Sequence, residues 1–164
     1  MKNQLINYTL YNLWANTKVC DEFLSKVDES LLDQEMTSSF PSIRKTTYHI
    51  WDAEFIWLNR LVGGNVTVLP IRHEPMFFPV FKEKFLSVSR HFVEFVSSKE
   101  DSYFTQNLTY KNSEGKEFTN AINDIIHHVM NHSTYHRGQI ITLLREAGFT
   151  QVSSTDYITW CRLR

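Results

Sequence analysis

The sequence predicts an all-α protein, a four-helix bundle with a short hairpin before the last long helix and a short C-terminal helix. Four long segments carry apolar residues at intervals of three and four, which is the period of an amphipathic helix. Glycine, proline and polar turn residues separate these segments. The chain has 164 residues, of which 42% are hydrophobic, and this is enough for one domain over residues 1–164 with its own core.

The first two helices are predicted from the N-terminal third of the chain. No proline or glycine interrupts the apolar pattern over residues 5–27, so one long helix is expected there. Residues 28–41 have the composition of turns. Ser42 is a suitable N-cap for a second helix over about 43–62, and the glycine pair at 63–64 is a typical signal for its end.

The remaining elements follow from the same reasoning. Residues 63–79 contain two glycines and three prolines and are expected to form a long loop. A third helix follows over about 80–96. Residues 103–118 alternate around an Asn-Ser-Glu-Gly turn and predict a short hairpin. A fourth helix is expected from about residue 119 to the glycine at position 148, and residues 155–160 are expected to dock as a short terminal helix.

Charge and composition exclude several classes of protein. The chain has 17 basic and 18 acidic residues, whereas a nucleic-acid-binding domain usually has a basic excess, so no nucleic-acid partner is expected. No apolar run approaches the roughly 20 residues of a membrane span, and the N-terminus lacks the apolar region of a secretory signal. Cys20 and Cys161 are isolated from each other. A cytoplasmic protein with reduced thiols and no membrane association is therefore predicted.

The histidines are concentrated in the fourth predicted helix, where four of the seven lie between His127 and His136. His132 and His136 are four residues apart, so on a helix both could reach one metal ion. On a helical wheel His136 lies about 20° from the centre of the apolar stripe, His132 about 60° and His128 about 100°, while His127 faces away. The predicted pair is therefore His132 and His136, and His128 with His132 is the alternative.

A metal centre on this helix requires a further ligand from another part of the chain. Catalytic zinc and nickel sites use about three protein ligands and keep one position open. The other histidines are His49, His73 and His91. The apolar pattern permits His49, in the second predicted helix, to face the interior, but it does not require this. Spacing alone favours His49 only slightly over His91.

Several segments of the chain resemble a known family. The string His-Ser-Thr-Tyr-His-Arg-Gly-Gln-Ile at 132–140, continued by Leu-Leu-Arg-Glu-Ala-Gly at 143–148, resembles the signature of the DinB-like family, which includes DinB and YfiT-type proteins. Residues 48–58 are similar to the family's second-helix motif, 11–16 to its first helix and 155–158 to its terminal segment. These matches follow the family's order and cover nearly the whole chain.

The resemblance implies a four-helix bundle that binds a divalent metal ion, usually nickel or zinc, through three histidines. One comes from the second helix and two from the fourth, which gives His49, His132 and His136 in this chain. It also implies a homodimer. Relatives with assigned chemistry include low-molecular-weight thiol S-transferases and a mycothiol-dependent isomerase, and others are described as metal-dependent hydrolases.

We therefore expect a metal-dependent enzyme that acts on a small molecule, with a low-molecular-weight thiol as one candidate substrate. Three neutral imidazoles leave a divalent ion its full charge, which acidifies a bound water or thiol. The alternative is a non-catalytic, metal-stabilised dimeric stress or interaction protein. Catalytic groups stay unassigned.

Two charged residues near the candidate ligands receive structural interpretations. Glu54 lies on the same predicted helix as His49 but more than about 90° away on the wheel, so a solvated or ion-paired carboxylate is expected. Arg137 follows His136 directly. It is expected either to bind an anionic substrate or to form an ion pair at an interface.

Overall fold

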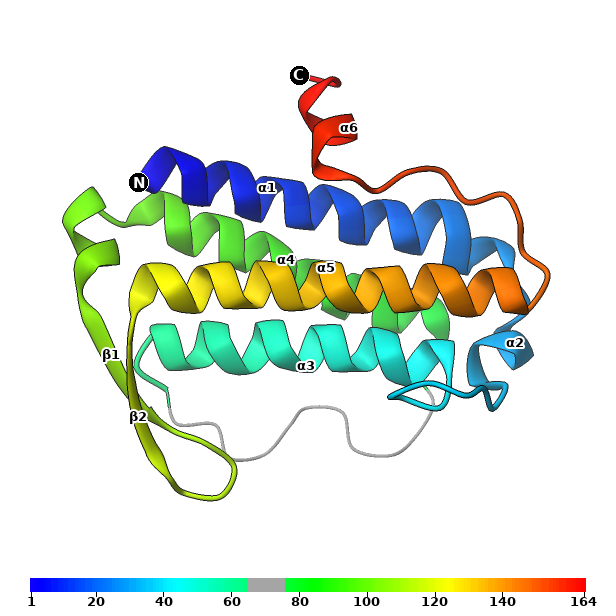
Figure 1. Ribbon diagram of the computed structural model, residues 1–164, viewed down its shortest axis with the longest axis horizontal. Helices are drawn as coiled ribbons and strands as arrows, with labels where there is room; N and C mark the ends of the chain where they lie inside the picture. Colours follow the sequence, from blue (N-terminus) through cyan, green and yellow to red (C-terminus); the bar gives the residue numbers. More distant parts are fainter. Residues whose placement is uncertain (65–75) are drawn as a thin grey trace.

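The computed structural model describes residues 1–64 and 76–164 and shows a bundle of four long helices (Figure 1). The predicted all-α fold is confirmed. The long helices are α1 (Lys2–Lys18), α3 (Ile43–Leu61), α4 (Phe78–Ser98) and α5 (Ile122–Glu146). Two short α-helices, α2 (Glu29–Asp33) and α6 (Tyr157–Cys161), a 3₁₀ turn at Asp101–Thr105 and one hairpin are also present.

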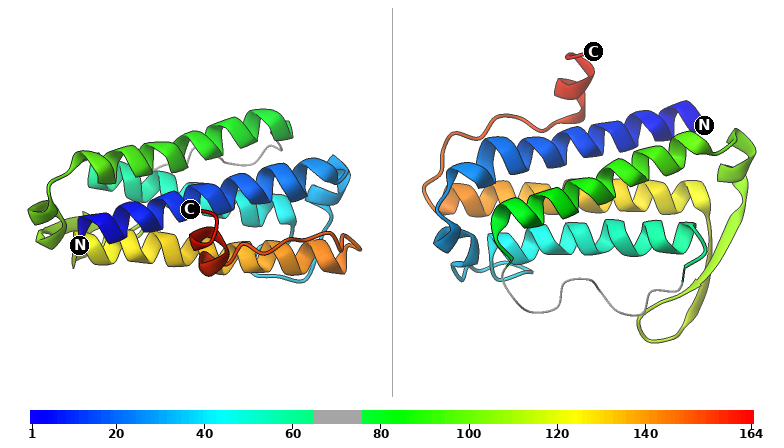
Figure 2. Two further views of the ribbon diagram at one scale, coloured as in Figure 1. Left: turned by 90° about the horizontal axis from the view of Figure 1, so that it is seen from above. Right: turned by 180° about the vertical axis from the view of Figure 1, so that it is seen from behind.

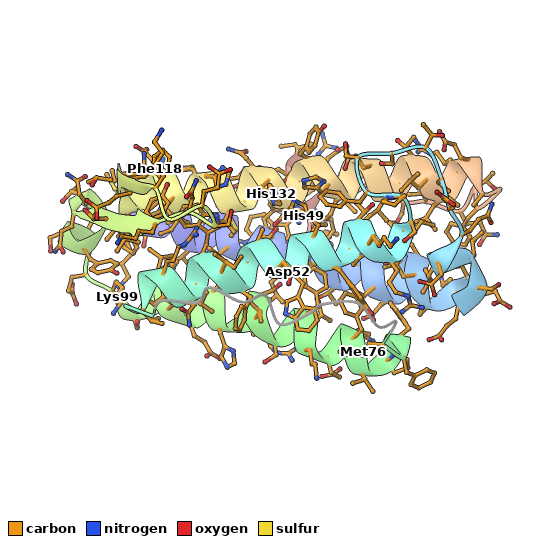
Figure 3. The ribbon with its side chains drawn as sticks, turned by 90° about the horizontal axis from the view of Figure 1, so that it is seen from below. His49, Asp52, Met76, Lys99, Phe118 and His132 are labelled. Carbon is orange, nitrogen blue, oxygen red and sulfur yellow. The ribbon has the colours of Figure 1, made fainter. Side chains whose placement is uncertain are left out.

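The four long helices lie side by side along the long axis of the molecule (Figure 2). Helices α1 and α5 run in one direction and α3 and α4 in the other (Figure 1). Helix α1 packs on α4 and α5, and α3 packs on α5 and α4. The face formed by α3 and α5 is seen from below in Figure 3, with the hairpin at one end. None of the described helices combines the length and hydrophobicity needed to cross a bilayer.

The first two long helices agree with the sequence-based boundaries. Helix α1 starts slightly earlier than predicted and continues through a π-helical turn at Val19–Phe23 and a 3₁₀ turn at Leu24–Lys26. Helix α3 has the predicted N-cap, because the Ser42 hydroxyl accepts a hydrogen bond from the Lys45 amide at 3.1 Å. After it, Gly63 has a φ of +84°, a left-handed conformation that favours glycine.

Helix α4 begins at Phe78, slightly earlier than predicted, with Pro79 in its first turn. Proline is tolerated there because the first amides of a helix have no partner within it. The rest of the predicted loop, residues 65–75, lies outside the described residues, and so does His73.

A hairpin forms, but it starts and ends later than the predicted 103–118, because residues 103–105 belong to the 3₁₀ turn at Asp101–Thr105. Its strands are β1 (Asn107–Lys111) and β2 (Glu117–Ala121), which pair antiparallel with Thr109 opposite Thr119. Residues 119–121 therefore belong to β2, and α5 begins at Ile122 instead of near residue 119. The predicted start of α5 was wrong because residues 119–121 pair with β1 instead of forming helical hydrogen bonds.

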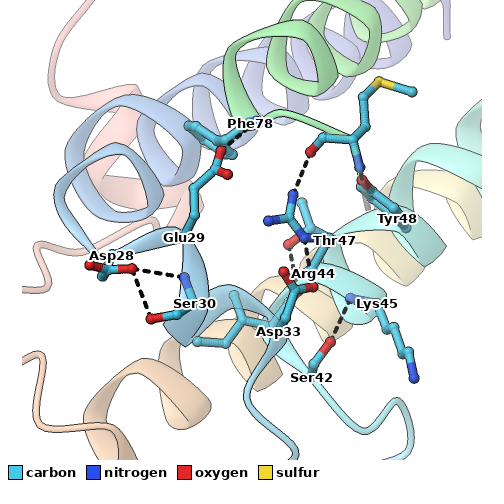
Figure 4. Close-up of polar contacts among 12 residues, drawn as sticks. Asp28, Glu29, Ser30, Asp33, Ser42, Arg44, Lys45, Thr47, Tyr48 and Phe78 are labelled. Atoms are coloured by element: carbon cyan, nitrogen blue, oxygen red, sulfur yellow. Dashed lines mark hydrogen bonds and ion pairs between the residues drawn. The ribbon is translucent and has the colours of Figure 1, made fainter. Parts of the chain in front are cut away.

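The short helix α2, which was not predicted, ties α3 to the start of α4 (Figure 4). Arg44 donates from Nε to the Asp33 carboxylate and from Nη1 to the Met76 carbonyl oxygen, both at 2.7 Å. Glu29 accepts a hydrogen bond from the Phe78 amide at 2.7 Å. These contacts fix the end of the bundle that lies nearest to the connection between α2 and α3.

Candidate metal centre

The fold brings the three predicted ligands together between α3, which carries His49, and α5, which carries His132 and His136. Figure 3 shows His49 and His132 side by side. Each of His49, His132 and His136 offers one ring nitrogen, and these nitrogens all lie within 4.8 Å of one another. Nε2 of His49 and Nε2 of His132 are 2.9 Å apart. Within the described residues, this is the one group of three or more histidine, cysteine or acidic side chains arranged to hold an ion.

The amphipathic pattern of α5 explains how its histidines are placed. Val129 and Ile140, one on each side of the pair in sequence, are fully buried in the core. His136 is buried beside them, His132 is half-buried at the flank, and His127 and His128 are exposed. This order of burial agrees with the helical wheel.

The environment keeps the three imidazoles uncharged at neutral pH. Burial, together with the neighbouring His136, lowers the pKa of His49 from 6.5 to about 4. Burial and the adjacent histidines lower the pKa of His132 to about 3. Burial also lowers the pKa of His136. Neutral imidazole is the form that binds a metal, so the group has its lone pairs available.

Hydrogen bonding selects the tautomer of one ligand. Nδ1 of His136 lies 2.7 Å from Oε1 of Gln139, which is one turn further along α5. An amide oxygen only accepts, so Nδ1 of His136 carries the hydrogen and Nε2 keeps its lone pair. A hydrogen bond of this kind, to the nitrogen that does not bind the ion, is the usual support of a metal-bound histidine.

The contact between His49 and His132 fits a shared cation. Two neutral imidazole nitrogens 2.9 Å apart repel each other unless one carries a hydrogen. Nitrogens that bind one ion at about 2.0–2.1 Å stand roughly 3 Å apart, so the observed separation matches a shared ligand role. Nδ1 of His132 is also buried with no hydrogen-bond partner in the part of the chain that is described. The residues present therefore fit a divalent ion.

An aromatic side chain that the sequence analysis missed covers one side of the group. Phe40 stacks on His49, with ring centroids 4.0 Å apart and an interplanar angle of 26°, and meets the edge of His136 at 5.6 Å. The hydroxyl oxygen of its neighbour Ser39 accepts a hydrogen bond from the Gln139 amide nitrogen at 3.5 Å. A lone phenylalanine within the otherwise polar stretch before Ser42 was the signal that could have identified it.

The remaining histidines stand apart from the group. His128 is exposed and its ring centroid lies 5.9 Å from that of His132, with Trp57 on its other side at 5.6 Å. His127 is exposed and its Nδ1 contacts the Asn123 carbonyl oxygen at 2.8 Å. His91 is exposed on α4. His128 is thus not part of the three-histidine group, so His132 is grouped with His136 and not with His128.

The expectation for Glu54 is wrong. This side chain is 0% exposed, so its carboxylate is not solvated, and it forms no direct ion pair with any described residue. It accepts hydrogen bonds from two amides of α1, one hydroxyl of α4 and one of α5, at 2.6–3.1 Å; the donors are Asn12, Asn16, Ser89 and Ser133. The helical wheel failed because it describes one helix, whereas three other helices supply these donors.

Both expectations for Arg137 are also wrong. The side chain is 1% exposed inside the bundle, so it reaches neither a substrate nor an interface. Its Nη1 donates to the amide oxygens of Asn12 and Asn16, whose amide nitrogens donate to Glu54. Two asparagines thus bridge a buried guanidinium and a buried carboxylate. Burial lowers the pKa of Arg137, while Tyr11 and Glu54 favour its charged form.

Comparison with known proteins agrees with this arrangement. The family model of the DinB family matches residues 1–161. The chain belongs to the DinB family. Protein DinB of Bacillus subtilis (strain 168) is 28% identical over 154 residues, which cover 90% of this chain and 87% of that protein. The resemblance drawn from the histidine string is therefore confirmed.

A solved structure shows the same fold as this DinB-family chain. The crystal structure of a DinB-like protein from Bacillus cereus ATCC 10987 superimposes with a TM-score of 0.67 and 20% sequence identity. The match covers 89% of this chain and 95% of that chain. Membership of the DinB family and the three-histidine group together fit metal binding.

Proposed function

We propose that His49, His132 and His136 bind one divalent metal ion and that the protein is a metal-dependent enzyme of the thiol S-transferase or hydrolase type. The observation that carries this proposal is the group of three uncharged imidazoles whose nitrogens lie within 4.8 Å of one another. Nickel and zinc are the proposed ions, because both are well suited to imidazole ligands.

The number of ligands favours catalysis over a structural role. Structural zinc sites are usually closed by four protein ligands, whereas catalytic sites use three and leave a position for water or substrate. The group has three members within the described residues. A divalent ion bound there supplies Lewis acidity, which lowers the pKa of a water or thiol enough to give a nucleophile at neutral pH.

The side chains of the protein have distinct parts in this proposal. Gln139 accepts the Nδ1 proton of His136, so that Nε2 keeps the lone pair that a metal ion requires. Phe40 shields one face of His49 from water. Glu54 cannot act as a base, because its carboxylate is fully buried and already accepts four hydrogen bonds. Cys20 is buried and its pKa is raised by burial, which makes it an inert thiol.

Metal analysis of protein purified without chelators or metal-affinity columns tests the proposal. The wild type is expected to carry about one equivalent of nickel or zinc, and His49→Ala, His132→Ala and His136→Ala to carry far less. The matched control is His127→Ala, an exposed histidine on the same helix, which should retain the ion. A metal-free wild type that also fails to bind added nickel or zinc contradicts the proposal.

Activity assays separate the proposed enzyme from the alternative. The metal-loaded protein is expected to turn over at least one member of a panel of low-molecular-weight thiols with electrophiles, or of small esters. The non-catalytic, metal-stabilised dimer would be favoured by three results together: the metal is tightly bound, chelation lowers Tm strongly, and no substrate is turned over. The homodimer and the cytoplasmic location stay predictions.

A further inference from the structure

A pocket of about 330 Å³ lies between α3, α5 and the hairpin. Six residues line it: Trp57 from α3, Tyr110 from β1, Asn120 from β2, and Asp124, Ile125 and His128 from α5. This volume lies within the range of small-molecule sites, which combine aromatic walls with a few polar groups.

The pocket adjoins the candidate metal centre through His128. The ring centroid of His128 lies 5.9 Å from that of His132 on one side and 5.6 Å from that of Trp57 on the other. Phe40, which covers His49, is not among the residues that line the pocket. A molecule that reacts at the histidines therefore has room to extend over His128 towards the hairpin.

The apolar walls of the pocket are fixed in place. Trp57 and Tyr110 meet edge to face, with ring centroids 4.8 Å apart. The Arg60 guanidinium lies 4.6 Å from the Trp57 ring centroid and 4.9 Å from that of Tyr110, and it donates a hydrogen bond to the Lys111 carbonyl oxygen at 2.9 Å. These contacts hold the hairpin against α3, so the aromatic walls are formed before any ligand arrives.

The polar groups of the pocket favour a ligand that donates hydrogen bonds. The Asp124 carboxylate is exposed, and no described residue forms an ion pair or a hydrogen bond with it. An ionised carboxylate only accepts hydrogen bonds. Tyr110 already donates its hydroxyl to Asn120 Oδ1 at 2.9 Å, so its oxygen is left as an acceptor. Asp124 is the one acidic side chain among the six lining residues.

We propose that this pocket binds the non-reacting part of the substrate and selects a planar cationic group with N–H donors, such as an amidinium or an aromatic ammonium. The flat group lies between the aromatic walls while its N–H groups donate to Asp124. The assignment to a substrate rests on the proposed function, whereas binding of the planar cation requires no metal ion.

Benzamidine is a suitable probe, with benzoate as a planar anion of similar size. In two-dimensional ¹H–¹⁵N NMR of the full chain, benzamidine is expected to shift the Trp57 indole signal saturably, and benzoate is not. The signal is assigned by its absence in Trp57→Phe. Asp124→Asn should weaken benzamidine binding about tenfold or more. The matched control is Glu146→Gln, an exposed acid at the far end of α5, which should leave it unchanged.

Three results would overturn the pocket proposal: no saturable shift of Trp57, equal affinity in Asp124→Asn, or equal binding of benzoate. His136→Ala removes a proposed metal ligand but no residue of the pocket lining. Repeating the benzamidine titration with this variant therefore tests the pocket separately from the metal centre. A wild type that fails to bind metal, combined with normal benzamidine binding in His136→Ala, would refute the metal centre alone. Bound metal without any benzamidine shift would refute the pocket alone.

Discussion

Helices α3 and α5 carry two polar clusters with opposite properties. One is the three-histidine group between the two helices, and the other is the network inside the bundle that contains Glu54 and Arg137. Neighbouring residues of α5 serve both, because His136 belongs to the first and Arg137 to the second. In the interior network, donors meet acceptors through the two asparagines. In the three-histidine group, Nε2 of His49 and Nε2 of His132 face each other at 2.9 Å.

This difference separates a structural cluster from a binding one. Buried charges are tolerated when hydrogen bonds satisfy them, and the Glu54 carboxylate accepts four. Each cluster leaves one buried nitrogen without a partner among the described residues, Nδ1 of His132 and Nε of Arg137, so orphaned atoms do not distinguish them. The histidine group differs because its facing atoms are ring nitrogens of neutral imidazoles. A group of neutral imidazoles can accept an external cation, whereas the interior network already pairs a positive with a negative charge through its asparagines.

The largest expected effect comes from breaking the interior network. Arg137→Ala leaves the Glu54 charge buried without its guanidinium, so the free energy of unfolding of the metal-free protein should fall by about 3–5 kcal/mol. Urea denaturation measures this. Arg145→Ala, an exposed arginine on the same helix, should change stability by less than about 0.5 kcal/mol. Equal stabilities of the two variants would show that the network contributes little.

The three-histidine group is expected to affect stability through the ion that it binds. Nickel or zinc at about 100 to 1,000 times its Kd should stabilise the wild type by about 3–4 kcal/mol, since it binds the folded state. Thermal denaturation with added metal and after chelation measures the shift. His132→Ala should lose the stabilisation, and His127→Ala should keep it. Equal stabilisation of both variants would place the ion elsewhere.

A smaller effect is expected from the residue that orients His136. Gln139→Leu removes the acceptor for Nδ1, so metal affinity should fall about 10- to 100-fold while the fold is retained. Competition with a chromogenic chelator measures the affinity. Gln139→Glu keeps an acceptor oxygen and should retain most of it. If Gln139→Leu binds metal as tightly as the wild type, the hydrogen bond does not support the site.

The smallest effect concerns pH. His49 and His132 have lowered pKa values in the folded state, about 4 and about 3, against 6.5 for the free side chain. The unfolded chain binds protons first, so the metal-free protein should lose stability as the pH falls from 7 towards 4. Their partial exposure limits the loss to about 1 kcal/mol for each group. His132→Ala should show a shallower pH dependence in chemical denaturation, and an unchanged slope would contradict the pKa values.

The sequence predicted the fold because apolar periodicity marks each long helix independently of its neighbours. It also predicted His132 and His136, since both lie on one helix and their spacing suffices. His49 required the resemblance, because its direction depends on how α3 packs against α5. Glu54 was misinterpreted for the same reason. Its partners lie on other helices, and no local pattern links them to it.

The proximity of the two clusters has a consequence for how an ion is acquired. Ser133 and Arg137 on α5 are hydrogen-bonded in the interior, directly next to the two histidines. A rotation of α5 that moved the histidines would pull these residues away from Glu54 and the asparagines. The imidazoles are therefore pre-organised when the chain folds, so little conformational entropy is lost on binding. The backbones of the metal-free and metal-bound proteins are expected to coincide.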